Sequence, residues 1–373
     1  MPSRETDLPT LQRRFADFAS TYAELPVYSA ICRGVAEDEE CAALLQSAAN
    51  TQDRPVLWLA AVHDLVLREP DLPAARWYAS VVGRDAVPAG DPWPDVRRTV
   101  LEHRDELRAV IASHSTQTNE VNRCAYLAPC VALAAADVPN RPLALVELGA
   151  SAGLLLLLDR FREELTSKDG GVIFGDPEAE VRCVAEDRSA HPLTRRRGLA
   201  VPPISARVGL DQDPIDLSDA DEIRWLEACL WPDVPGRIER FRAAVEVARR
   251  EPPLVVRGDL VTDVAEVLAQ AVEQAEPDSH LLVSSSWALT YVERSRRDDV
   301  IDAVRDVAGS VRAVSLLTAE PPKCVPGLRV PPSVSDDSGQ LTVLGLHHWR
   351  DGEELPPVVL GTCHPHGTWV AFD

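Results

Sequence analysis

The first 140 residues carry hydrophobic side chains at helical spacing. Apolar residues recur every three to four positions, which places them on one face of a helix. Segments rich in Pro and Gly, such as VPAGDPWPD (87–95), separate these runs, and only very short strand candidates occur. The expected helices are LQRRFADFASTYA, EECAALLQSAA, RPVLWLAAVHDLVL, DVRRTVLEHRDELRAVIAS and NEVNRCAYLAPCVALAAA. The pattern predicts an all-helical N-terminal domain over residues 1–140.

From residue 143 short β-rich runs alternate with helical ones. The expected strands are LALVEL, ISARVGL, PLVVRGDL, HLLVSSSWAL, VRAVSLL, LTVLGLHHW and TWVAF. The expected helices are LLLLLDRFREEL, ADEIRWLEACL, GRIERFRAAVEVARR, DVAEVLAQAVEQA and RRDDVIDAVRDVA. This alternation predicts an α/β fold with a Rossmann-like, doubly wound and mostly parallel sheet. The last two strands have no helix between them, which predicts a terminal antiparallel hairpin.

The second domain is therefore expected to span residues 141–373. It contains an insertion at about 162–204, between the first helix and the second large strand. The insertion holds two possible short strands, GVIFG and EVRCVAE, and the basic turn TRRRG.

Charge and composition narrow the classes of function. The net charge of −21 disfavours a nucleic-acid or anionic-membrane partner, and the only basic cluster is Arg195–Arg197. No apolar stretch reaches 18 residues, and MPSRETDLPT lacks the apolar core of a signal peptide, so a cytoplasmic protein is expected. The eight cysteines never form C-x-x-C, and we expect them to be reduced core residues.

The segment LALVELGASAGLLLLLDRF (143–161) joins the first strand to the next helix. In a doubly wound sheet, ligands bind outside the carboxyl ends of the strands. A dinucleotide-binding pattern starting at Gly149 would need glycine where the chain has Ser151 and Leu154. A phosphate-binding loop fails as well, because Gly153 is followed by Leu154 rather than Lys. The remaining pattern is acid-x-Gly-x-x-x-Gly, formed by Glu147, Gly149 and Gly153.

This pattern resembles the first motif of class I S-adenosylmethionine-dependent methyltransferases. The resemblance implies that the backbone of the 149–153 turn, with Ser151 in it, approaches the methionine and ribose of the cofactor. It also implies that Glu147 meets the positive side of the sulfonium or the ammonium group. The alternative is that both glycines serve only the close packing of helix and strand.

Later strands extend the resemblance. It implies that Asp211, after the second large strand, holds the ribose hydroxyls, and that Asp259, after the third, contacts adenine. The resemblance also implies that Ser285, on the fourth strand, lies at the edge that faces the methyl group of the cofactor. Glu147 and Asp211 are 64 residues apart, whereas about 20 is usual. The assignment therefore requires the insertion to lie inside the first crossover.

Several stretches together resemble a bacterial family known only as a domain of unknown function. They are TQTNEVNR (116–123), VELGASAGL (146–154), GLDQDPIDL (209–217), CLWPD (229–233) with Arg237, and CHPHGTWV (363–370). The resemblance covers most of the chain and implies a helical domain joined to a methyltransferase-like Rossmann fold. It implies no particular reaction. The chain departs from the family at Leu155, where Asn is common.

The QTNEV segment has two interpretations. Glu120 and Arg123 are three residues apart and can share a helix face, so they can serve as a cap and an internal salt bridge. Alternatively, this segment covers the cofactor cleft, with Asn119 and Arg123 binding substrate and Glu120 acting in catalysis.

Other candidates lie near the C-terminus and after the fourth strand. His364 and His366 are candidate bases, and Ser286 and Tyr291 are candidate substrate-binding residues. The spacing of these histidines and Cys363 matches no usual zinc pattern, so no metal is expected.

The resemblance therefore implies an S-adenosylmethionine-dependent methyltransferase, and we expect it to act on a small molecule. A substrate nucleophile would attack the sulfonium methyl in line, and the enzyme would contribute positioning and one general base. The alternative is a non-catalytic binding or regulatory protein on the same fold. The methylated atom and the oligomeric state stay open.

Overall fold

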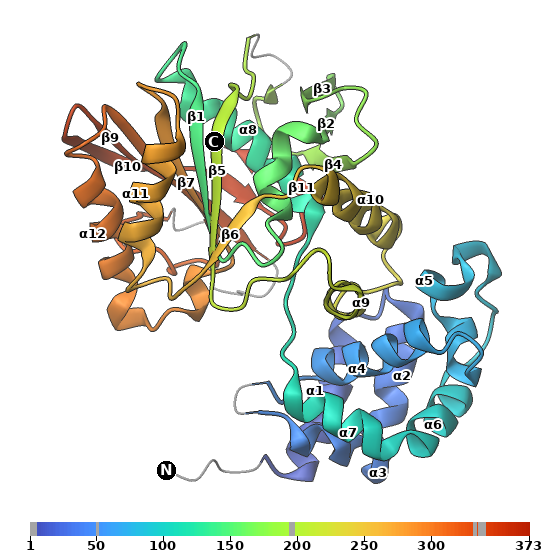
Figure 1. The fold of residues 1–373 in the computed structure, drawn as a ribbon. Helices are drawn as coiled ribbons and strands as arrows, with labels where there is room; N and C mark the ends of the chain where they lie inside the picture. The colour runs from blue at the N-terminus through green and yellow to red at the C-terminus, as the bar shows by residue number, and fades with distance from the viewer. Residues whose placement is uncertain (1–5, 50–51, 194–197, 331–333, 335–340) are drawn as a thin grey trace. The chain divides into compact units, whose positions relative to one another are not determined.

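The structure is a computed structural model of the 373-residue chain. It describes residues 6–49, 52–193, 198–330, 334 and 341–373 (Figure 1). Contacts divide the chain into two compact units, residues 1–119 with 218–241 and residues 120–217 with 242–373. This division differs from the expected boundary at residue 140. Helix α8 (Cys124–Ala136) falls in the second unit, and helix α9 (Ala220–Ala228) falls in the first.

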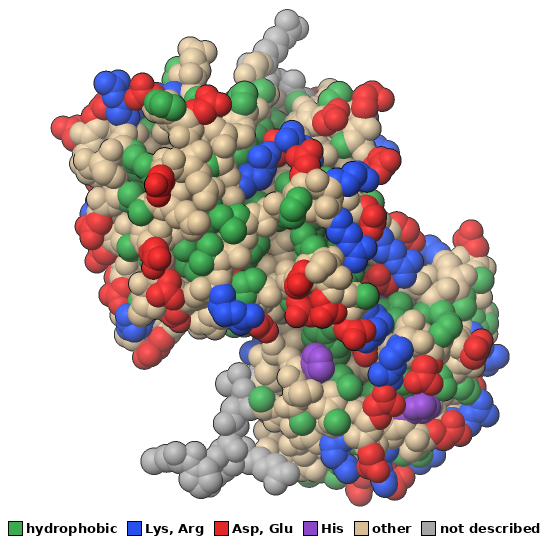
Figure 2. Space-filling model, in the orientation of Figure 1, with side chains coloured by type: hydrophobic (Ala, Val, Ile, Leu, Met, Phe, Trp, Pro, Cys, Tyr) green, Lys and Arg blue, Asp and Glu red, His purple; other side chains and the backbone are tan. Residues whose placement is uncertain are grey.

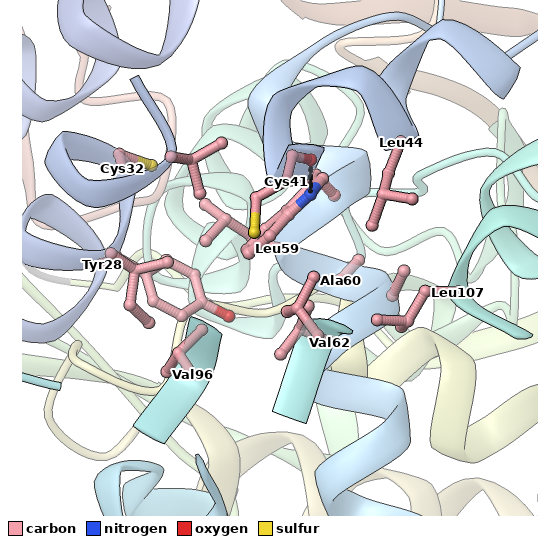
Figure 3. Packing of buried hydrophobic residues seen from close by; sticks show 14 of the residues in the cluster. Tyr28, Cys32, Cys41, Leu44, Leu59, Ala60, Val62, Val96 and Leu107 are labelled. Carbon is pink, nitrogen blue, oxygen red and sulfur yellow. Dashed lines mark hydrogen bonds between the residues drawn. The ribbon is translucent and has the colours of Figure 1, made fainter. Parts of the chain in front are cut away.

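The described part of the first unit contains helices and no strand. Its helices are α1 (Leu8–Thr21), α2 (Pro26–Ala36), α3 (Glu39–Ala43), α4 (Pro55–Arg68), α5 (Ala79–Val82), α6 (Trp93–Glu102), α7 (Arg104–Ser113) and α9, followed by the start of α10 (Arg237–Arg250). Buried side chains from several of these helices form one hydrophobic core (Figure 3). Within it the indole nitrogen of Trp58 donates to the carbonyl of Cys41 at 3.0 Å, so a buried polar atom is satisfied.

Helix α4 explains why residues 218–241 belong to this unit. Nearly all of its side chains are buried, as expected for a helix that is apolar all round. Its buried Asp64 pairs with Arg224 of α9 at 2.8 Å. The Nδ1 atom of His63 hydrogen-bonds the carbonyl of Ala228 at 3.1 Å.

The second unit contains one sheet of 11 strands, ordered β3-β2-β4-β11-β10-β9-β8-β7-β1-β5-β6. The strands are β1 (Leu143–Leu148), β2 (Arg162–Ser167), β3 (Gly170–Gly175), β4 (Arg182–Asp187), β5 (Ile204–Asp211), β6 (Leu254–Arg257), β7 (His280–Ser286), β8 (Ala313–Glu320), β9 (Thr342–Arg350), β10 (Glu353–Cys363) and β11 (Trp369–Phe372). The fold is mixed α/β and the sheet is mostly parallel, as expected.

Five neighbouring strands, β6-β5-β1-β7-β8, are all parallel. Along the chain they are the third, second, first, fourth and fifth of the set, so the strand order reverses between β1 and β7. Such a reversal is the topological switch point of an open α/β sheet. At this point Glu147 of β1 lies in register with Gly209 of β5 and Ser284 of β7.

Helices cover both faces of this parallel core. On one face, α11 (Val264–Gln274) and α12 (Arg297–Val307) pack on alternate strand residues such as Val146, Val208 and Val283. On β1, Glu147 points to the other face, because successive strand residues alternate in direction. The almost wholly buried α8 lies in contact with β8, β4 and β2.

The Leu-rich segment after β1 differs from the expected helix. It forms a 3₁₀ turn, η5 (Leu154–Arg160), and then strand β2. Strands β3 and β4 coincide with GVIFG and EVRCVAE, and all three strands join the main sheet inside the β1-to-β5 crossover. In the basic turn TRRRG, residues 194–197 lie outside the described residues.

The end of the sheet also differs from the expected hairpin. Strands β9 and β11 form as expected, but β10 lies between them and pairs with both. Its sequence contains Pro356 and Pro357, which lack backbone donors and so disfavour a strand prediction. The register shift between Leu355 and Val358 accommodates them.

None of the described helices combines the length and apolar character that a membrane crossing requires. On the face shown in Figure 2, acidic and basic side chains are interspersed on both units.

Candidate functional site

The turn after β1 has an unusual backbone. Three of its five residues have positive φ: Gly149 (77°), Ser151 (53°) and Gly153 (71°). A Cβ at residue 149 would lie 2.4 Å from the Cβ of Ala288, and one at residue 153 would lie 2.6 Å from Cγ of Pro253. Close packing therefore accounts for the absence of a side chain at both glycines.

Asp211, the last residue of β5, fixes this turn to the neighbouring strand. Its Oδ2 accepts the backbone N–H of Ser151 at 2.7 Å, and its Oδ1 accepts that of Asp213 at 2.8 Å. A carboxylate has about four acceptor positions, so further donors can still bind there.

Glu147 lies beside this turn, at the carboxyl end of β1. Its side chain is 4% exposed, and its buried Oε2 atom has no hydrogen-bond partner among the described residues. Burial raises the pKa of Glu147 well above its ordinary value, the charge of Asp211 raises it further, and the charge of Arg123 opposes both. Burial thus favours the protonated acid. Its Oε2 atom is therefore free to hydrogen-bond a group other than the described residues.

Arg123 joins three segments that are far apart in the sequence. It lies in the short 3₁₀ turn η4 (Val121–Arg123) and is 4% exposed. Its Nε donates to the carbonyl of Pro365 at 3.1 Å, and its Nη1 donates to the carbonyl of Ser286 at 3.0 Å. The Ser286 hydroxyl also hydrogen-bonds the hydroxyl of the buried Tyr126 at 3.2 Å. The structure therefore brings together Arg123, Ser286 and the turn that carries the C-terminal histidines.

Glu120 and Asn122 shape the same segment. Glu120 caps η4, because its Oε1 accepts the backbone N–H of Asn122 at 3.0 Å. The Asn122 side chain donates to the carbonyl of Gly367 at 2.8 Å and accepts the N–H of Val184 at 2.9 Å. Sequence analysis did not single out Asn122, since its partners are distant in the chain. Asn119, the last residue of the first unit before the crossing, is buried, and its Nδ2 has no hydrogen-bond partner among the described residues.

His364 and His366 lie in the turn between β10 and β11. The Nδ1 atom of His364 accepts the backbone N–H of His366 at 3.1 Å, and the two rings are 5.6 Å apart. Both side chains are half-buried. Because Pro365 between them binds Arg123, these candidate bases belong to the same cluster as Ser286.

Asp259 holds its own turn. Its Oδ1 accepts the N–H groups of Val261 and Thr262 at 2.8 and 3.2 Å, and its Oδ2 accepts the Gln212 amide at 2.9 Å. The hydrogen bond from Val261 is the largest of the influences that lower the pKa of Asp259.

Ser285 is directed to a buried acid that sequence analysis missed. Its hydroxyl donates to Oε1 of Glu320 at 2.7 Å, and the N–H groups of Ala288 and Leu289 donate to the same oxygen at 2.9 and 3.0 Å. Glu320 is fully buried, which raises its pKa. An acid at the carboxyl end of a buried strand was the signal used for Asp211, and it would have found Glu320 as well.

Tyr291 does not join the cluster through any hydrogen bond among the described residues. It ends the turn η7 (Leu289–Tyr291), and its side chain is 73% exposed.

In the described part of the chain, Glu69, His103 and Glu106 have the spacing of a metal-binding group, with ligand atoms within 4.8 Å of one another. They lie in the first unit, and none of the three was named as a candidate in the sequence analysis. Arg68 forms ion pairs with both glutamates and supplies their countercharge.

A protein-family model matches most of the chain. The model of a family described as "Uncharacterized protein conserved in bacteria (DUF2332)" matches residues 12–372. The chain belongs to this family. Membership in a bacterial family of unknown function is therefore confirmed, and no curated protein matches the chain. The family description names no reaction.

Proposed function

We propose that this DUF2332 protein is a cytoplasmic S-adenosylmethionine-dependent methyltransferase acting on a small molecule. One observation carries the proposal: Glu147 and Asp211 lie at the carboxyl ends of adjacent parallel strands, beside the point where the strand order reverses. Ligands of open α/β sheets bind at this edge. The three-strand insertion lies inside the β1-to-β5 crossover, which accounts for the long interval between Glu147 and Asp211.

The residues at this edge fit a nucleoside with a charged amino-acid arm. Asp211 retains acceptor positions for ribose hydroxyls beyond its two backbone donors. The unpartnered Oε2 of Glu147 offers a buried polar contact to the amino-acid arm. The cofactor would supply an electrophilic methyl group on its sulfonium.

The chain itself would position the substrate and accept its proton. Arg123 and Ser286 form the fixed part of the substrate side, since each bonds to a different segment of the second unit. Glu120, His364 and His366 are the candidates for the base, and correct placement supplies most of the rate enhancement in such a transfer.

A non-catalytic binding protein is the second candidate. It is favoured because packing accounts for both glycines, and Asp259 and Ser285 hold internal hydrogen bonds. The two glycines, Asp211, Asp259 and Ser285 then have structural roles, and Glu147 is the exception.

Calorimetric titration with S-adenosylmethionine and S-adenosylhomocysteine separates the two, with NAD as the control ligand. We expect micromolar binding of both sulfur nucleosides and at least a tenfold loss in Asp211→Ala. Asp213→Ala is the matched control, because Asp213 lies two residues away and pairs with the exposed Arg257. Absence of binding by a folded wild-type protein would overturn the enzyme proposal.

A further inference from the structure

Arg123 carries a buried positive charge that no ion pair offsets within the described residues. Two of its nitrogens bond to backbone carbonyls, which carry no net charge. Its third nitrogen, Nη2, makes no hydrogen bond to a described residue. Burying a charge without a partner costs several kcal/mol, and an arginine stays protonated in proteins. The guanidinium therefore has one nitrogen left with which to bind an anion.

The groups around Arg123 are donors. The hydroxyls of Ser286 and Tyr126 share one hydrogen bond, so one of their two hydrogens has no acceptor among the described residues. Burial raises the pKa of Tyr126, and the charge of Arg123 opposes this effect only in part. The phenol therefore stays protonated and remains a donor. Glu147 has no partner for its Oε2, and burial favours its protonated form, which is also a donor.

The nearby acids do not neutralise Arg123. Its charge lowers the pKa of both Glu147 and Glu320, but burial outweighs it at each. Glu320 moreover accepts hydrogen bonds from Ser285, Ala288 and Leu289. The cluster thus offers one fixed cation and hydroxyl donors to an outside acceptor.

We propose that Arg123, with Ser286 and Tyr126, is the receptor for a carboxylate group of a bound small molecule. The guanidinium is held rigid by Pro365 and Ser286, so little side-chain entropy is lost on binding. The carboxylate has two possible sources, and the first is the amino-acid arm of the cofactor. For that source the proposal rests on the proposed function. The other source is the substrate itself.

The test compares Arg123→Met with Arg297→Met. Arg297 is a matched control, because its three nitrogens donate to the carbonyls of Val292, Cys324 and Thr290 and leave none for a ligand. Each protein is titrated with S-adenosylhomocysteine and with 5′-methylthioadenosine, the same thioether nucleoside without the carboxylate. Each is also heated with 50 mM acetate, benzoate or succinate at constant ionic strength.

Two results support the receptor and identify its source. If Arg123 binds the arm of the cofactor, S-adenosylhomocysteine binds at least tenfold more tightly than methylthioadenosine, and only Arg123→Met removes the difference. If it binds the substrate, the two nucleosides bind alike, and a carboxylate raises the melting temperature of wild type and Arg297→Met but not of Arg123→Met.

Failure of this proposal is distinct from failure of the methyltransferase proposal. Protection by carboxylates with no nucleoside binding would keep the receptor and remove the cofactor. Equal binding of both nucleosides to all three proteins, with no protection by any carboxylate, would overturn the receptor and keep the cofactor. If no nucleoside binds and no carboxylate protects a folded wild-type protein, both proposals fall.

Discussion

The carboxylate of Asp211 accepts the backbone N–H of Ser151 at 2.7 Å, across 60 residues of chain. This bond joins the turn after β1 to the end of β5, and it gives Asp211 a structural role beside any role in binding. The two roles have different signatures, because a loss of stability needs no ligand to be observed.

Asp211→Asn should therefore reduce the free energy of unfolding by about 1–3 kcal/mol, since one of two backbone donors loses its acceptor. Asp213→Asn is the control, because its pairing with Arg257 is exposed and such pairs contribute less than about 1 kcal/mol. Urea denaturation measures both. Equal effects of the two substitutions would contradict the bridging role of Asp211.

Substitution of Glu320 should be far more costly than substitution of Ser285. Glu320→Ala leaves the N–H groups of Ala288 and Leu289 buried without an acceptor, and we expect a loss of about 3 kcal/mol or more. Ser285→Ala removes one hydrogen bond and should cost about 1 kcal/mol.

The same Ser285→Ala variant tests the expected cofactor role of Ser285. If its hydroxyl only holds Glu320, affinity for S-adenosylhomocysteine stays unchanged while stability falls. A fivefold or greater loss of affinity in a folded variant would instead assign Ser285 to the ligand.

Gly149→Ala should destabilise the second unit more than Gly352→Ala. Both residues have left-handed backbones, with φ of 77° and 82°, which cost an alanine about 1–2 kcal/mol. A Cβ at residue 149 would also collide with Ala288, whereas one at residue 352 meets nothing within 4 Å. Thermal unfolding of the two variants measures the difference, and identical melting temperatures would show that the turn opens to admit the methyl group.

His280 should make the protein less stable in mild acid. Burial lowers the pKa of this side chain to about 4, and the positive charges of His348, Arg350 and Arg141 add to the effect. Between pH 6.5 and 4 the unfolded chain binds a proton at this histidine that the native state does not bind. The free energy of unfolding therefore falls as the pH is lowered from 6.5 to 4, by about 3 kcal/mol in total. His280→Gln should flatten this part of the stability curve. An unchanged slope in the variant would show that another group titrates.

Glu163 should make the protein less stable as the pH rises, which is the opposite of the effect of His280. Its side chain is fully buried, both oxygens lack a partner among the described residues, and burial raises its pKa to about 10. The native state then keeps a proton that the unfolded state releases above pH 4.5, so stability falls as pH rises toward 10. Glu163→Gln should gain up to about 4 kcal/mol relative to wild type between pH 5 and pH 8. The pH dependence of urea midpoints measures this, and a constant difference would contradict it.

The sequence predicted the parallel core well because each of its strands is a short apolar run bounded by turns. It failed at the leucines after Gly153, since an apolar run buried on all sides has no period that separates helix from strand. It failed at β10, where Pro356 and Pro357 lie in a bulged register.

The sequence predicted those residues of the candidate site that local patterns mark. Glu147, Asp211 and the glycines follow from strand ends and turn chemistry. The partners of Arg123 and Asn122 are different in kind, because both side chains bond to carbonyls far along the chain. Such contacts leave no periodic signal in the sequence.

The first unit consists of residues 1–119 and 218–241, so its two parts are translated at different times. Helix α4 leaves the ribosome about 160 residues before α9, the partner of its Asp64 and His63. Domains usually fold as units, N-terminal first, as they are made. Here the contacts of α4 with α9 can form only after strands β1 to β5 have been translated. During that interval Asp64 and His63 lack the partners that α9 gives them in the folded unit.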